Sequence, residues 1–207
     1  MAKLAKTLRI LRDDNINVKW PHRPRAMDGW IGDEWHQQRS SDHNPNKRDT
    51  VDAIDVDSTQ PAAPATPIHV PTVIAAMIMH PSTHYVIHNR RIMDADDKFM
   101  PHAYTGANQH DKHIHDSIRQ SALAENAAVV YKFILKSMTW GLLKRNSRGN
   151  QVKELEAYLI GWGYAVAVTG IFGPKDEAAV RAFQHKMGIQ VDGQVGPVTR
   201  QKLRPFK

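Results

Sequence analysis

The sequence predicts an α+β N-terminal unit with a small antiparallel sheet, followed by a small all-α unit. In the first unit, residues 51–57 alternate as a strand does, and residues 85–87 and 91–93 flank a turn as in a hairpin. In the second, apolar residues recur at helical spacing over 152–162 and 180–187. With 207 residues, 41% of them hydrophobic, the chain is long enough to bury a core. We expect domains at 1–138 and 139–207.

The remaining N-terminal elements follow from local patterns. Residues 70–79 read as a helix with Pro71 in its first turn. The Pro- and Ala-rich run over 60–67 is expected to be a connecting loop. An Ala-, Val- and Leu-rich segment over 123–135 predicts a helix that closes the unit. Turn-forming and basic residues over 141–150 then mark the start of the second unit.

The second unit contains a near repeat. Gly170-Ile171-Phe172-Gly173-Pro174 returns 23 positions later as Gly193-Gln194-Val195-Gly196-Pro197. The glycines permit a tight loop in each copy, and Asp176 or Thr199 can cap the helix that follows. The unit is therefore expected to be a small helical bundle with two matched loop-to-helix entries.

The cysteine and histidine counts restrict the chemistry. The chain has no cysteine and 12 histidines, which excludes a disulfide scaffold, a thiolate zinc finger and a cysteine nucleophile. Catalysis or metal binding must use imidazole and carboxylate groups. The sequence has no apolar run of the roughly 18 residues that a membrane span needs, and its opening residues do not form a secretory signal. We expect a cytoplasmic product without stable membrane association.

The positive charge is concentrated near the C-terminus. Of the net charge of +7, +6 falls on residues 144–207. A basic surface of this kind suits a polyanion, either a nucleic acid or an anionic cell envelope, and charge alone does not choose between them.

The C-terminal third resembles the peptidoglycan-binding domain attached to many cell-wall hydrolases, which implies a three-helix fold. The matching positions are Leu143, Ser147, Gly149, Val152, Leu155, Gly170, Phe172, Gly173, Ala179, Val180, Phe183, Gln184, Asp192 and Gly193. The positions that depart from the family pattern are Asn146, Glu156, Thr169 and Asp176. Most matching positions are core or turn residues, so no ligand-contacting residue is nominated there.

Two clusters in the N-terminal unit could hold a metal. His43 ends the run Ser41-Asp42-His43, and on a strand Asp55 and Asp57 share one face. In the second cluster, His113 and His115 point to one side of a strand with Ile114 opposite. Carboxylate oxygen and imidazole nitrogen suit a divalent metal, and a catalytic zinc needs only three protein ligands.

These clusters resemble the motifs of zinc metallopeptidases that include D-alanyl-D-alanine carboxypeptidases and phage L-alanoyl-D-glutamate endopeptidases. The resemblance implies Zn²⁺ bound by His43, Asp55 and His115, with His113 handling the proton and His110 as an additional catalytic histidine. Many relatives carry an acidic general base where this chain has Lys112. The general base therefore stays open among His113, His110 and Asp111.

Other residues near the clusters have weaker assignments. Ser41 and Arg39 are expected to contact substrate, although Arg39 could equally be a surface ion-pair partner. Asp57 is expected to face solvent or to support the site without binding the metal. His84 and His88 would share a strand face, which makes a rival metal site conceivable.

Together these expectations describe a monomeric zinc peptidase with bacterial peptidoglycan as its partner and no nucleic acid. It would be a phage endolysin, held in the host cytoplasm until release, in which zinc-activated water cleaves a peptide bond of the stem peptides or cross-links. A host D-Ala-D-Ala carboxypeptidase and a non-catalytic wall-binding or virion protein remain the alternatives.

Overall fold

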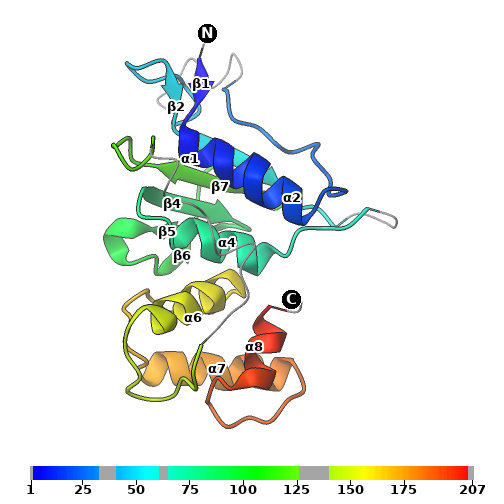
Figure 1. Ribbon diagram of the computed structural model, residues 1–207, viewed down its shortest axis with the longest axis vertical. Helices are drawn as coiled ribbons and strands as arrows, with labels where there is room; N and C mark the ends of the chain where they lie inside the picture. The colour runs from blue at the N-terminus through cyan, green and yellow to red at the C-terminus, as the bar shows by residue number, and fades with distance from the viewer. Residues whose placement is uncertain (1, 33–40, 61–64, 126–139, 205–207) are drawn as a thin grey trace.

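The computed structural model describes residues 2–32, 41–60, 65–125 and 140–204. A mixed N-terminal unit and a helical C-terminal unit lie one above the other in Figure 1. Within the described residues, no helix has the length and apolar character needed to cross a membrane.

A five-stranded antiparallel sheet forms the centre of the N-terminal unit, as predicted. Its strand order is β3-β7-β4-β5-β6. The strands span Ala53–Asp57 (β3), His113–Ile118 (β7), Thr83–His88 (β4), Arg91–Asp94 (β5) and Pro101–Ala103 (β6). The predicted hairpin is β4–β5, whose two turn residues, Asn89 and Arg90, both have positive φ, as the twist of a tight hairpin requires.

The predicted strand over residues 51–57 divides into two. β2 (Thr50–Val51) pairs in parallel with β1 (Lys3–Leu4), whereas β3 joins the main sheet. The break falls at Asp52, whose N–H donates to the carbonyl of Asp42 instead of joining a ladder. The chain therefore turns from one sheet to the other just before the segment that carries Asp55.

One face of the main sheet packs against helices. Ile54, Val56, Val86 and Ile114 are buried there in one cluster with residues of the N-terminal helix and of α4 (Val70–Ile78). The N-terminal helix consists of α1 (Lys6–Arg9), the π-helical segment η1 (Ile10–Ile16) and α2 (Asn17–Lys19). A short 3₁₀ helix, η2 (Ala95–Asp97), follows β5. The opposite face of the sheet is left for Asp55, His113 and His115.

The C-terminal unit is all-α, as predicted, and contains α6 (Asn150–Gly161), α7 (Pro174–Lys186) and α8 (Pro197–Leu203). Both predicted loops are held by the same kind of hydrogen bond, in which a glycine N–H donates to a side-chain oxygen. The Glu156 carboxylate accepts the N–H of Gly170 at 2.8 Å, and Gln184 Oε1 accepts the N–H of Gly193 at 2.8 Å. Both glycines have φ near +72°, a conformation that L side chains rarely adopt.

The two predicted helix caps differ in outcome. Asp176 accepts the N–H of Gly173 at 2.8 Å and caps α7, as expected. The expectation for Thr199 is wrong, because α8 has no side-chain cap. The Thr199 hydroxyl instead bonds Gln184 and the carbonyl of Gln194, which draws it into the loop rather than toward the helix start.

The two units pack closely on each other. α4 lies against α6, and a Cβ added at Gly161 would come within 2.7 Å of the Pro71 carbonyl oxygen. Arg91 Nη1 donates to the Gly163 carbonyl at 2.7 Å, which ties β5 to the end of α6. The predicted boundary at 138/139 lies outside the described residues, as does most of the helix expected over 123–135, whose first residues form turns.

Candidate metal centre

Strand pairing brings the two predicted clusters together. In the β3–β7 register, Asp55 is opposite His115 and Asp57 is opposite His113. His43 reaches the same place from a loop, although it lies 72 residues from His115 in the chain. Three separate segments therefore contribute to one site on the open face of the sheet.

The three predicted ligands converge. His43, Asp55 and His115 each offer one donor atom, and these atoms all lie within 4.8 Å of one another. His115 Nδ1 is 3.0 Å from Asp55 Oδ1 and 3.2 Å from His43 Nε2, which is 3.4 Å from Asp55 Oδ2. Two imidazoles and one carboxylate form a donor set that zinc accepts, so the residues present fit the predicted ion.

A backbone carbonyl orients His43. His43 Nδ1 lies 3.1 Å from the Trp30 carbonyl oxygen. Because a carbonyl only accepts, Nδ1 donates to it, and Nε2 is the ring nitrogen that faces the other two donors. The loop holding Trp30 is itself bonded to β3, since Gly29 and Asp55 exchange backbone hydrogen bonds at 3.2 and 2.7 Å.

Contacts between Asp55 and the two imidazoles shift the pKa values within the cluster. Burial raises the pKa of Asp55, but hydrogen bonds and charge from His115 and His43 outweigh it and hold that pKa well below its usual range. Burial likewise lowers the pKa of His43, but Asp55 outweighs it and the net shift is upward. A carboxylate so stabilised stays ionised, which is the form that binds a metal.

His113 and His110 stand beside the three donors. His113 Nε2 is 3.7 Å from Asp55 Oδ1, and it is a buried nitrogen without a hydrogen-bond partner among the described residues. The His110 ring lies 4.8 Å from the His113 ring, and its Nδ1 is 2.8 Å from the Asn108 carbonyl oxygen. Burial, followed by repulsion from His115 and His113, lowers the pKa of His110 to about 4. Both predicted catalytic histidines are therefore at the site.

The predicted substrate contacts are less direct. The Ser41 hydroxyl oxygen accepts the N–H of His43 at 3.3 Å, so it shapes the turn that presents this ligand. Arg39 lies outside the described residues. Asp111 is exposed at the entrance to β7, and its role as a general base stays a prediction.

Asp57 is not among the three donors, as expected, but of its two alternatives solvent exposure is wrong. Asp57 is 1% exposed and accepts hydrogen bonds from the N–H groups of Met27 and Thr59 and from the Thr59 hydroxyl. It anchors the end of β3. The alternation that placed it beside Asp55 could not show that a neighbouring loop would cover this end of the strand.

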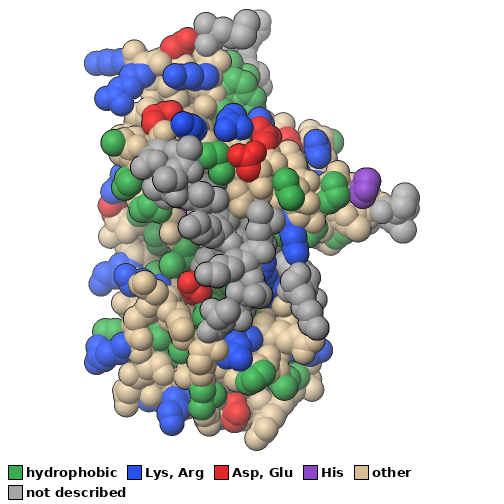
Figure 2. Space-filling view, viewed as in Figure 1, with side chains coloured by type: hydrophobic (Ala, Val, Ile, Leu, Met, Phe, Trp, Pro, Cys, Tyr) green, Lys and Arg blue, Asp and Glu red, His purple; other side chains and the backbone are tan. Residues whose placement is uncertain are grey.

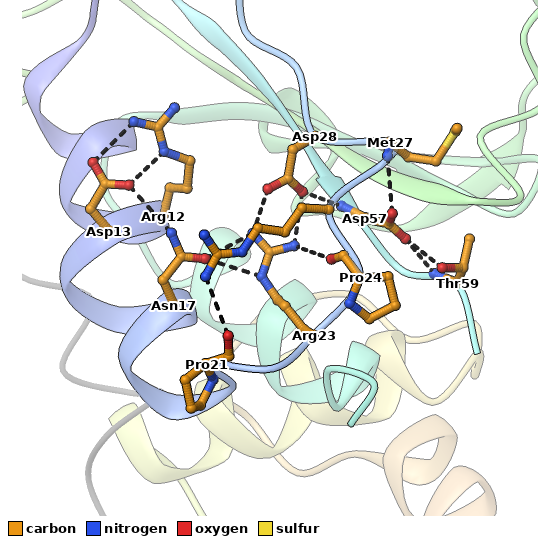
Figure 3. A network of polar contacts seen from close by, with 11 residues as sticks. Arg12, Asp13, Asn17, Pro21, Arg23, Pro24, Met27, Asp28, Asp57 and Thr59 are labelled. Carbon is orange, nitrogen blue, oxygen red and sulfur yellow. Dashed lines mark hydrogen bonds and ion pairs between the residues drawn. The ribbon is translucent and has the colours of Figure 1, made fainter. Parts of the chain in front are cut away.

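Sequence reasoning missed the network that holds this loop, drawn in Figure 3. The buried Arg23 guanidinium donates to Asp28 at 2.6 and 2.8 Å and to Asn17 at 2.9 and 3.2 Å. Asp28 in turn accepts the N–H of Asp57 at 2.8 Å. The forked pair fixes the segment that leads to Trp30 and thereby supports His43. Arg23 and Asp28 are only five residues apart, but they lie in a segment without a regular helix or strand, so no periodic spacing could have revealed the pair.

The rival site suggested by His84 and His88 does not form as predicted. His88 Nε2 lies 3.3 Å from the Ser58 hydroxyl, while His84 is grouped with Asp94 and Asp96. Asp96 is exposed and paired with Arg119 at 2.5 Å. In this second group Asp96 is therefore the exposed member, and its charge is neutralised by an arginine.

Comparisons with known proteins identify the C-terminal unit. Residues 148–203 match the family model of the peptidoglycan binding domain. The zinc D-Ala-D-Ala carboxypeptidase of Streptomyces albus G is 39% identical over 69 residues, covering 31% of this chain and 27% of that protein. The N-acetylmuramoyl-L-alanine amidase CwlL of Bacillus licheniformis is 40% identical over 68 residues, covering 31% and 19%.

Among solved structures, the endolysin of Burkholderia phage AP3 shares 34% identity over 31% of this chain and 25% of its own, with a TM-score of 0.31. The matches to the curated relatives fall in the binding domain, and the chain spans 27% or less of the length of these two proteins. Residues 148–203 of the C-terminal unit thus carry the match to the peptidoglycan binding domain, and the matches to the zinc carboxypeptidase and the amidase fall in this same part of the chain.

Proposed function

We propose that the protein is a peptidoglycan hydrolase in which a zinc peptidase unit is held on the cell wall by the binding domain. The observation that carries the proposal is the meeting of His43, Asp55 and His115, from three distant segments, on a chain with a peptidoglycan binding domain. A cluster of imidazole and carboxylate donors on the open face of a sheet is costly to assemble unless it binds something.

The three donors would hold the ion, and the neighbouring histidines would handle the proton. A zinc ion bound there supplies Lewis acidity, which polarises a peptide carbonyl and activates water. The donors carry one negative charge in total, so they leave a divalent ion net positive. His113, whose Nε2 is buried 3.7 Å from Asp55 Oδ1, would pass a proton to the leaving amine. His110, beside it, is the second group able to serve.

The net charge of +6 on residues 144–207 supports an anionic wall as the partner. Two carboxylates of the binding domain, Glu156 and Asp176, do not lie on its surface, because both are buried and accept hydrogen bonds from loop N–H groups. Glu177 is paired with Arg145 and Arg181. On the face drawn in Figure 2, Lys and Arg side chains lie over both parts of the molecule. Retention on walls should therefore weaken gradually as salt rises.

The origin and the bond cleaved are finer parts of the proposal. The run Ser41-Asp42-His43-Asn44-Pro45 resembles a branch of these peptidases found in actinobacterial phages and in their hosts, so it agrees with a phage endolysin and with a host enzyme alike. An endolysin would cut within stem peptides or cross-links and solubilise the wall. A host carboxypeptidase would release only D-Ala.

Digestion of isolated walls tests the proposal. The full chain should expose new amino groups and clear the wall suspension, a chelator should abolish both effects, and added zinc should restore them. His115→Ala should remain inactive with zinc present, whereas His102→Ala, a change at an exposed histidine paired with Asp97, should act like the unaltered chain. Release that continues after complete metal removal would overturn the zinc mechanism. Retention on walls without any release would favour the non-catalytic alternative.

A further inference from the structure

Asp42 lies between Ser41 and His43 but is not one of the three metal donors. Its Oδ2 accepts hydrogen bonds from the Tyr85 hydroxyl at 2.8 Å and from the Ser117 hydroxyl at 2.5 Å. Tyr85 is on β4 and Ser117 on β7, where they are opposite each other in the ladder. One carboxylate thus bridges two neighbouring strands on the face that carries the metal centre.

The same tyrosine also contacts a predicted ligand. The Tyr85 and His115 rings are stacked, with centroids 5.5 Å apart and planes 16° from parallel. His115 offers Nδ1 to the cluster, so the stacked ring limits rotation of the imidazole about its side-chain bonds. Tyr85 is therefore attached to Asp42 at its hydroxyl and to His115 at its ring face.

Backbone bonds complete the connection. The N–H of Asp52 donates to the Asp42 carbonyl at 3.1 Å, and the N–H of Ile118 donates to the Asp52 carbonyl at 2.9 Å. The loop that ends in His43 is thus joined to the start of β3, to β4 and to β7. These are the segments whose relative positions set the distances among the three donors.

We propose that Asp42 and Tyr85 are positioning residues of the metal centre, with Ser117 as their support. This inference rests on the proposed function. Asp42 fixes the loop that presents His43, and Tyr85 transfers that restraint to the ring of His115. Ligands already held in place lose less conformational freedom when an ion binds, and removing such supporting partners typically weakens metal binding about 10–100-fold.

Zinc affinity of the full chain, measured by competition with a chromophoric chelator, tests the inference. Asp42→Asn should raise the zinc dissociation constant about 10–100-fold, because an amide cannot accept both hydroxyls as strongly as a carboxylate. Tyr85→Phe keeps the stacked ring and should cause a smaller loss, whereas Tyr85→Leu should lose about as much as Asp42→Asn. Tyr164→Phe and Asp14→Asn, changes of the same kind away from the network, should leave affinity unchanged.

A second readout separates positioning from general destabilisation. If the two residues act through one contact, Asp42→Asn combined with Tyr85→Phe should bind zinc no more weakly than Asp42→Asn alone. The absorption spectrum of bound Co²⁺ should change in these variants and not in the controls. Tyr85→Phe and Ser117→Ala are the milder variants to use should Asp42→Asn unfold the metal-free chain.

Different results overturn different parts. Unaltered zinc affinity and an unaltered Co²⁺ spectrum in the Asp42 and Tyr85 variants would refute the positioning role and leave the metal centre in place. If the unaltered chain binds neither ion, the proposed metal centre fails and the positioning role fails with it.

Discussion

The loops of the C-terminal domain and the histidine site of the N-terminal unit are built over very different distances in the chain. Gly170 and Gly193 are each held by a side chain 14 or 9 residues earlier. At the site, His43 meets His115 across 72 residues, and Asp55 meets His115 across 60. Local contacts of the first kind leave a repeated pattern in the sequence, whereas the second kind depends on strand register and on loops packing from elsewhere.

Breaking the long-range site should have the largest effect and should leave the local one intact. Asp55→Asn removes the only carboxylate among the three donors and the charge that raises the pKa of His43. We expect zinc affinity to fall by more than about 100-fold, since loss of a supporting partner alone costs 10–100-fold. Wall hydrolysis should be lost with it.

Retention on isolated walls, measured by co-sedimentation, should be unchanged in Asp55→Asn because the binding domain is untouched. Asp97→Asn, a change at an exposed carboxylate, serves as the matched control. Loss of retention together with hydrolysis would show that the two regions are not separable in this way.

The local contacts can be broken at Glu156. Its carboxylate accepts the N–H groups of Thr169 and Gly170 and the Thr169 hydroxyl. Glu156→Ala leaves these groups without the carboxylate that accepts their hydrogen bonds. We therefore expect the free energy of unfolding to decrease by about 3 kcal/mol. Thermal or urea unfolding at pH 7 measures this.

Glu156→Gln is the informative partner, since the second loop already uses Gln184. Burial raises the pKa of Glu156, so its contribution to stability is greatest at low pH and falls as pH rises from about 4.5 through the folded pKa. The amide should remove this pH dependence and keep the loop. A stability profile identical to that of the unaltered chain would contradict the burial argument.

The contact between the two units tests whether they are independent. Gly161→Ala places a methyl group 2.7 Å from the Pro71 carbonyl oxygen, so α6 and α4 must separate. We expect a loss of about 2 kcal/mol in the free energy of unfolding. Gly141→Ala, where the nearest atom would be 4.0 Å away, is the control. Equal stability of the two variants would mean that the packed interface contributes little.

A smaller effect is expected from acid in the N-terminal unit. His80 is 5% exposed, its Nδ1 accepts the N–H of Ser82, and burial lowers its pKa to about 4. Between the unfolded pKa near 6.5 and the folded pKa, only the unfolded chain takes up this proton. The free energy of unfolding therefore decreases as the pH is lowered. His80→Asn should reduce the loss between pH 7.5 and pH 5.5 by about 1.4 kcal/mol. An identical pH profile in urea unfolding would refute the assignment.

The same contrast explains how much the sequence could predict. The β4–β5 hairpin, the helix beginning at Val70 and both glycine loops depend on neighbours in the chain, and all are present as expected. Motif resemblance and strand alternation together predict the three donors. The Trp30 carbonyl that orients His43 is a backbone group without any sequence pattern, and the burial of Asp57 depends on a loop some 30 residues away.

Mass spectrometry of wall fragments after digestion by the full chain tests the central claim most directly. The account predicts soluble fragments with newly cut stem peptides or cross-links, each bearing a free amino group, formed with zinc and absent after chelation. Fragments whose peptides are all intact and whose glycan strands are cut, or the same peptide products after complete metal removal, would contradict it.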